Sequence, residues 1–148
     1  MATGNDGMRK TNTVILISCV SKKLGKEAKA RDLYVSTLFK LNLQYAESLD
    51  PDFIFILSAK YGLLSLDETV APYDWSLNDM RASERKAWAN NVIKQLNEVL
   101  NIKEAHFVFL AGQKYRQYLI PPLSFYEIPL QGLRIGEQLQ HLKRQVAK

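Results

Sequence analysis

The first residues that could carry chemistry stand directly after an apolar run. The run VILIS (14–18) predicts a buried parallel strand, and the segment SCVSKK (18–23) continues from its end. Backbone amides in a turn of small residues can hold a phosphate together with lysine side chains. The segment lacks the glycine spacing of a P-loop, and a solvated basic loop would also account for it. Its candidate substrate-binding residues are Ser18, Cys19, Ser21, Lys22 and Lys23.

A second group of polar residues begins a predicted helix over about residues 31–48. Asp32 and Ser36 are one helical turn apart in ARDLYVSTLF (30–39), so both would lie on one helix face. The Asp32 carboxylate would either favour the helix dipole or orient a water molecule or a sugar hydroxyl. Asp32 is therefore a candidate catalytic residue, and Ser36 is a candidate substrate-binding residue.

The third group lies in SAKYGLLSLDETVAPYD (58–74), which follows the apolar run FIFIL (53–57). Lys60 and Tyr61 come directly after this predicted strand, and Gly62 permits a turn. A connection this long without periodicity is usually functional or disordered, and its tyrosine, leucine, valine and proline content argues against disorder. We therefore predict a folded, irregular loop that forms one wall of a pocket. Its candidate site residues are Ser58, Lys60, Tyr61, Gly62, Tyr73 and Asp74.

Two further candidate binding residues follow later apolar runs. Gly112 comes directly after HFVFLA (106–111), and Arg134 stands in PLQGLRIGEQL (129–139), where a final helix is expected to start. Glycines in these segments would let a ligand approach the backbone closely, and tight packing between elements would explain them equally well. Gly112 and Arg134 are therefore included as candidate substrate-binding residues.

Strands and helices alternate along the chain, and this alternation determines where the polar groups meet. Apolar runs predict strands at 14–18, 53–57, 106–111 and 124–130. The pattern predicts a three-layer α/β/α fold with a four-stranded, mainly parallel sheet in the order 2-1-3-4. Ligands bind outside the carboxyl ends of the strands at the switch point of such a sheet, here between strands 1 and 3. We therefore expect the candidate residues to meet at that edge.

Length and composition narrow the function classes further. We expect one domain over 13–148 of this 148-residue chain, after a flexible tail over 1–12. No apolar run approaches the ~20 residues of a membrane span, and a cytoplasmic location is expected. The single cysteine excludes a disulfide framework, and no ligand set indicates a metal or another cofactor. The net charge of +5 is compatible with a nucleic-acid or nucleotide partner.

Five short motifs resemble an uncharacterised family of small bacterial, archaeal and phage proteins. They span Ser18 to Leu139 and read C-x-S-K-K, A-x-D-L-Y-x-S-x-x-F, L-S-A-K-Y-G-L-L, P-Y-D and P-L-x-G-L-x-I-G. More distantly, the first turn and the Tyr-x-Ser helix are similar to a domain of archaeosine synthases that is related in fold to uracil-DNA glycosylases. This resemblance implies the strand order 2-1-3-4, and it places segment 18–23 where glycosylases hold their water-activating loop. The sequence has no G-Q-D-P-Y-H stretch of the glycosylase type.

Together these features favour an enzyme that acts on a nucleobase or nucleotide, by cleavage or exchange of an N-glycosidic bond. Such a reaction needs a carboxylate to orient water, a cation near the leaving base or phosphate, and an aromatic ring to stack the base. Asp32 or Asp74 would supply the carboxylate. Lys60 would be the cation, with Lys22 or Lys23, or would form a Schiff base if desolvated. Tyr61 or Tyr73 would stack the base.

Two other functions remain open on the sequence alone. The same basic edge would serve a non-catalytic nucleic-acid or nucleotide-binding module, in which lysines contact phosphates and tyrosines stack on bases. Alternatively, the 58–74 segment would be a protein-interaction surface, with Trp75 and Leu77 exposed in a patch.

Overall fold

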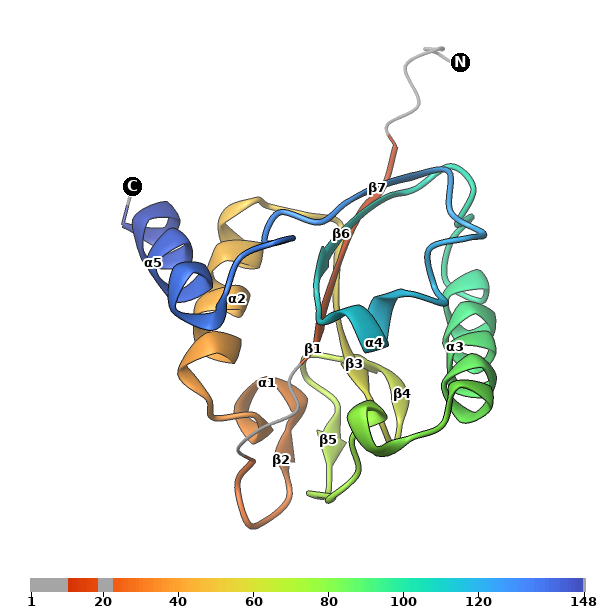
Figure 1. Cartoon of the computed structure of the whole chain (residues 1–148), viewed down its shortest axis with the longest axis horizontal. Coiled ribbons are helices and arrows are strands. Elements are labelled where there is room, and N and C mark those ends of the chain that lie inside the picture. Colours follow the sequence, from red (N-terminus) through yellow and green to blue (C-terminus); the bar gives the residue numbers. More distant parts are fainter. Residues whose placement is uncertain (1–10, 19–22, 148) are drawn as a thin grey trace.

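A central β-sheet organises the chain (Figure 1). The structure is a computed structural model that describes residues 11–18 and 23–147. The strands of this sheet are β1 (Thr13–Ser18), β3 (Phe53–Ser58), β4 (Gly62–Ser65), β6 (His106–Leu110) and β7 (Phe125–Glu127). They lie in the order β4-β3-β1-β6-β7, and all neighbours pair in parallel except β3 and β4. The predicted α/β class with a mainly parallel sheet is confirmed.

Helices cover both faces of this sheet. One face carries α1 (Ala30–Leu33), α2 (Thr37–Ser48) and α5 (Ile135–Val146), and the other carries α3 (Ala82–Asn97) and α4 (Gln113–Arg116) (Figure 1). Side chains along β1 alternate between the two buried clusters, with Ile15 and Ile17 toward α2 and with Val14 and Leu16 toward α3. Because both faces are covered, β1 reads as a continuous apolar run.

The sheet has a switch point beside β1. The chain passes from β1 to β3 on one side and then crosses back to β6 on the other side of β1. The connections after β1 and β6 lead to opposite faces of the sheet, to α1 and α2 on one face and to α4 on the other, and such a switch point leaves a crevice between them at the carboxyl ends of the strands.

The prediction of an irregular loop over 58–74 and of a four-stranded sheet is wrong. Residues 62–65 form an additional strand of the central sheet, β4, which follows β3 after a tight turn and pairs with it antiparallel. The Ser58 hydroxyl accepts a hydrogen bond from the Tyr61 amide in this turn, at 3.0 Å. Farther along, β5 (Thr69–Val70) pairs with β2 (Ala28–Lys29) in a small second sheet. The segment is thus mostly a hairpin and a short strand, with Leu64 and Val70 buried.

The predicted helix over 31–48 is broken into two. Tyr34 has extended backbone angles and forms an antiparallel bridge with Lys23, which ends α1 after one turn. The Ser36 hydroxyl then accepts a hydrogen bond from the Phe39 amide at 3.2 Å and caps the start of α2. The sequence pattern predicted that Asp32 and Ser36 share one helical face. This prediction is wrong, because Asp32 belongs to α1 and Ser36 caps α2.

The predicted N-terminal tail and the predicted lack of a membrane span can be compared with the structure only for the described residues. Most of the predicted tail over 1–12 lies outside the described residues, but Asn12 is attached to the sheet, because its carbonyl accepts a hydrogen bond from the His106 amide at 2.8 Å. In the part of the chain that the structure describes, no helix combines the length and apolarity that a membrane crossing requires.

Gly62→Ala is expected to lower the free energy of unfolding by about 2 kcal/mol. Gly62 has φ +75°, a conformation that costs a non-glycine residue about 1–3 kcal/mol. An added Cβ would also lie 2.5 Å from Oε1 of Gln95, the atom that accepts a hydrogen bond from the Leu63 amide. Urea unfolding measures the change. Gly25→Ala is the control, because no heavy atom lies within 4 Å of its added Cβ; equal stability of the two variants would contradict the prediction.

Candidate functional site

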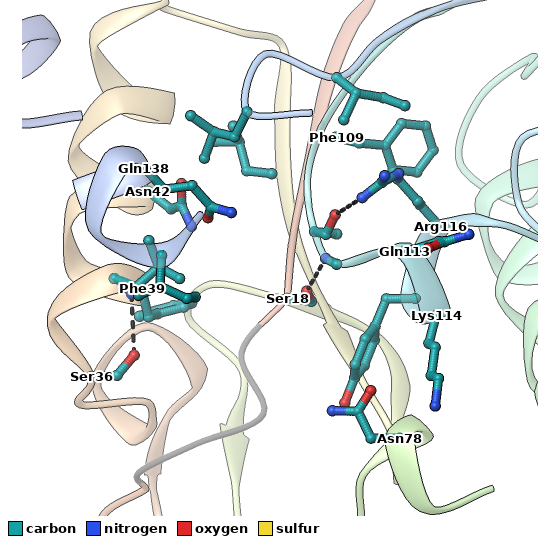
Figure 2. A pocket seen from close by; sticks show the side chains of 18 residues that line it. Ser18, Ser36, Phe39, Asn42, Asn78, Phe109, Gln113, Lys114, Arg116 and Gln138 are labelled. Carbon is teal, nitrogen blue, oxygen red and sulfur yellow. Dashed lines mark hydrogen bonds between the residues drawn. The ribbon is translucent and has the colours of Figure 1, made fainter. Parts of the chain in front are cut away.

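A cavity of about 520 Å³ opens at the carboxyl ends of β1, β6 and β7 (Figure 2). Its volume is in the range of small-molecule sites, roughly 300–1,000 Å³. Ser18 of β1 and the residues after β6 form its floor, and α2, α4 and α5 contribute its walls. The cavity thus occupies the switch point between β1 and β6, where ligands bind in sheets of this kind.

Ser18 joins the two strand ends at the floor of the cavity. Its hydroxyl accepts a hydrogen bond from the Gly112 amide at 3.3 Å, which ties the end of β1 to the segment after β6 (Figure 2). Ser18, Ser36 and Gly112 are the predicted binding residues that line this cavity. Ser18 ends β1, Ser36 lies in the connection from β1 to β3, and Gly112 follows β6, so these three candidates come from segments after two neighbouring strands.

Asn42 of α2 places a buried amide in one wall of the cavity. Asn42 is 3% exposed, and its side-chain oxygen Oδ1 has no hydrogen-bond partner among the described residues. In Figure 2 its side chain points toward the cavity beside Gln138 of α5. Gln138 is held by a hydrogen bond from its Nε2 to the Leu133 carbonyl at 3.0 Å. An unsatisfied buried acceptor costs about 1–3 kcal/mol, so Asn42 calls for an explanation beyond packing.

Arg116 of α4 places a cation on the opposite side of the cavity (Figure 2). Its Nη1 donates a hydrogen bond to the Ala111 carbonyl at 2.8 Å, which orients the guanidinium. Burial lowers the pKa of Arg116, although an arginine stays protonated near neutral pH. Among the described residues it forms no ion pair, and no aspartate or glutamate lines the cavity. A partly desolvated guanidinium without a carboxylate partner is well suited to bind an anion.

Three aromatic side chains contribute to the described lining beside a larger number of aliphatic ones. Phe39, Phe109 and Tyr115 contribute to the walls, and all three are buried. Tyr115 packs edge-on against Trp88 with ring centroids 5.7 Å apart, and its hydroxyl accepts a hydrogen bond from the Leu77 amide at 3.4 Å. Rings fixed in this way would form apolar sides for a planar ligand.

A second group of predicted residues lies together outside the cavity lining. We call it the cation–aromatic row; its members are Trp75, Lys60, Tyr61, Tyr73 and Lys23. The Lys60 ammonium lies 5.7 Å from the Trp75 ring centroid and 5.3 Å from that of Tyr61. The Tyr61 and Tyr73 rings meet edge to face at 5.6 Å, and the Lys23 ammonium lies 4.5 Å from the Tyr73 ring. The structure thus brings four of the predicted site residues together, and adds Trp75.

The three predicted catalytic residues do not line the described cavity. Asp32, Lys60 and Asp74 are all exposed, and no hydrogen bond or ion pair joins them to one another in the described part of the chain. Their expected convergence in one pocket is therefore not seen among residues 11–18 and 23–147. Cys19, Ser21 and Lys22 lie outside these residues.

The remaining predicted binding residues have structural surroundings. Ser58 is fully buried, its hydroxyl belongs to the turn before β4, and its carbonyl accepts a hydrogen bond from the Trp88 indole at 2.8 Å. Gly62 provides the positive φ of the same turn. Arg134 is exposed at the start of α5, where its amide donates to Glu137 Oε1 at 2.8 Å. These three do not line the cavity.

Sequence reasoning missed Asn42, Arg116 and Gln138. The available signal was a polar residue within an apolar helix face, because Asn42 lies three residues after Phe39 and four before Ala46, both of which are buried. Among the described residues, no group of three or more histidine, cysteine, aspartate or glutamate side chains could hold a metal ion.

Comparison with known proteins gives one family. Residues 14–144 match the model of a family described as a family of unknown function (DUF6884). A search of curated proteins finds no match.

Proposed function

The chain belongs to this family, and we propose that its cavity binds a nucleotide, with the base beside Asn42 and the phosphate beside Arg116. The observation that carries the proposal is the pairing of two groups across one cavity. One is a buried amide with an unsatisfied acceptor, and the other is a guanidinium without a carboxylate partner among the described residues. Oδ1 of Asn42 is buried as well as unpartnered in the described part of the chain. A ligand that is planar and polar at one end and anionic at the other would therefore match both groups once the Asn42 amide turns toward it.

The amide of Asn42 suits the edge of a nucleobase. An asparagine side chain offers a donor and an acceptor side by side, and base edges present the complementary pair. A half-turn of the terminal torsion exchanges the positions of Oδ1 and Nδ2, so the side chain can turn either group toward the cavity. The buried rings of Phe39 and Phe109 supply apolar walls for the base.

The opposite side of the cavity suits a phosphate. The guanidinium of Arg116 can form two parallel hydrogen bonds to phosphate oxygens, and Lys114 on the same helix adds a second positive charge to the lining. Binding an anion there would offset the desolvation that lowers the pKa of Arg116. The net charge of +5 acts in the same direction.

Calorimetric titration with nucleoside monophosphates and the matching nucleosides tests this proposal. We expect the monophosphates to bind more tightly than the nucleosides, and we expect the difference to shrink as salt is added, because only the phosphate contact is ionic. Absence of binding across nucleotides of all the common bases would overturn the proposal.

N-glycosidic bond cleavage or exchange is a second proposal for the same cavity. The order β3-β1-β6-β7 of the parallel strands and the position of the cavity support a glycosylase-like arrangement. The reaction needs a carboxylate, and Asp32 or Asp74 would have to supply it from outside the described lining. Chromatography for free base after incubation with nucleotides and oligonucleotides is the test. Full turnover by Lys60→Ala and Asp74→Asn would exclude the predicted catalytic assignment.

A further inference from the structure

The cation–aromatic row has the chemistry of a strand-binding surface. Trp75 is 55% exposed, and the ammonium of the exposed Lys60 lies within 5.7 Å of its ring centroid and within 5.3 Å of that of Tyr61. Exposed rings bind bases by stacking, and lysines beside them bind the phosphates that connect the bases. An exposed tryptophan with a lysine at its ring is therefore a platform for a base and its phosphate.

Contacts of Tyr34 connect the row to the lining of the cavity. The Lys23 ammonium at the end of the row lies 5.9 Å from the ring of Tyr34, and the Tyr34 hydroxyl is hydrogen-bonded to that of Tyr73 at 2.6 Å. The Tyr34 ring packs at 5.3 Å from the ring of Phe39, which lines the cavity. The row thus extends from an exposed tryptophan to the residues behind the cavity wall.

We propose that the cation–aromatic row binds single-stranded nucleic acid, so that the ligand of the cavity is one nucleotide of a polymer rather than a free nucleotide. This inference rests on the proposed function, because it places the neighbouring nucleotides of a bound base over the row. Trp75 stacks on a base, and Lys60 and Lys23 contact the backbone. Two lysines along one row of rings match the regular negative charge of a strand better than a single small anion.

Two carboxylates, those of Asp74 and Asp67, bear on the charge near the row. Asp74 is exposed next to Trp75 in sequence and would repel a phosphate placed near it. Asp67 lies 3.4 Å from the Arg31 guanidinium, which it shares with Glu47 at 3.5 Å. Within the row and its sequence neighbour Asp74, two lysines, Lys23 and Lys60, thus stand against one carboxylate.

The test compares an oligonucleotide with a mononucleotide. Fluorescence anisotropy with a labelled single strand of roughly ten nucleotides reports polymer binding, and calorimetry with the monophosphate of the same base reports the cavity. We expect the strand to bind more tightly than the monophosphate. Trp75→Ala should weaken strand binding about 5- to 150-fold, since stacking contributes about 1–3 kcal/mol per base, and Trp75→Phe should restore most of it.

Salt dependence separates the lysine contact from the stacking contact. Lys60→Ala should reduce the slope of log K against log salt by about 0.7, the value for one phosphate contact on a single strand. Phe125→Ala and Lys103→Ala are the controls. Phe125 is also 55% exposed, but both residues line a smaller hollow at the amino-terminal end of the sheet, so neither change should affect strand binding.

The outcomes distinguish this inference from the proposed function. If the monophosphate binds and the single strand binds no more tightly, or if Trp75→Ala has no effect on strand binding, the inference about the row is wrong. The proposed nucleotide site in the cavity is then unaffected. Binding of the single strand that depends on Trp75, with no binding of the monophosphate, supports nucleic-acid binding by the row and overturns the proposed nucleotide site in the cavity. Equal losses in Trp75→Ala and Phe125→Ala would also overturn the inference, because they would indicate a general loss of surface aromatic contacts.

Discussion

Asn42→Leu is expected to weaken nucleotide binding strongly while making the chain more stable. The leucine removes the hydrogen-bonding groups that the base would use, and base polar groups left unpaired in a closed cavity cost about 1–3 kcal/mol each. Two lost contacts would thus weaken binding about 30-fold or more. At the same time the substitution removes the unsatisfied Oδ1 from a position that is 3% exposed, so the free energy of unfolding should rise by about 1 kcal/mol.

The opposite signs of these two effects make the test specific. Calorimetric titration with a nucleoside monophosphate measures binding, and urea unfolding without ligand measures stability. Gln44→Leu is the control, because Gln44 is exposed on the same helix and should change neither quantity. If Asn42→Leu lowered stability and left affinity unchanged, Asn42 would be an ordinary polar core residue, and the proposed base contact would be wrong.

Buried parallel strands were the part of the fold that the sequence could predict. β1, β3 and β6 are covered on both faces, so each stands out as an apolar run between polar segments. β4 could not be recognised in the same way, because Gly62–Ser65 continues the chain through a tight turn and is only four residues long. The break between α1 and α2 was equally hidden, because Tyr34 has an extended backbone inside a helical pattern and owes it to a bridge with Lys23.

The candidate site was predictable only where it follows strands. Ser18 and Gly112 line the cavity because strand ends converge at a switch point, which strand order alone implies. Asn42 and Gln138 come from helices that meet only in the tertiary structure, α2 and α5. Lys60 and Tyr61 follow a strand as well, but they stand in the turn from β3 to β4, where they contact Trp75 and Tyr73 and do not line the cavity. A residue that directly follows a strand can therefore be assigned to the edge of the sheet where the strands end. Its position in the sequence does not show whether it lines the cavity or belongs to the cation–aromatic row.

Arg116→Met should convert a nucleotide site into a nucleoside site. Methionine keeps an apolar chain of similar length and removes the charge, so the base contacts should persist while the phosphate contact is lost. Hydrogen bonds to charged groups contribute about 1.5–3 kcal/mol, so monophosphate affinity should fall about 10- to 150-fold, whereas nucleoside affinity should stay within about twofold. The Ala111 carbonyl also loses its donor, so a loss of about 1 kcal/mol in stability should accompany the change.

The ratio of monophosphate to nucleoside affinity is the decisive measurement for Arg116, because a general loosening of the cavity would weaken both ligands alike. Arg116→Lys should retain part of the ratio, since a lysine keeps the charge but cannot form two parallel hydrogen bonds. Arg144→Met removes the same charge from an exposed position on α5 and should leave the ratio unchanged. A ratio in Arg116→Met equal to that of the unmodified chain would place the phosphate elsewhere, and Lys114, the other cation of the described lining, would become the residue to test.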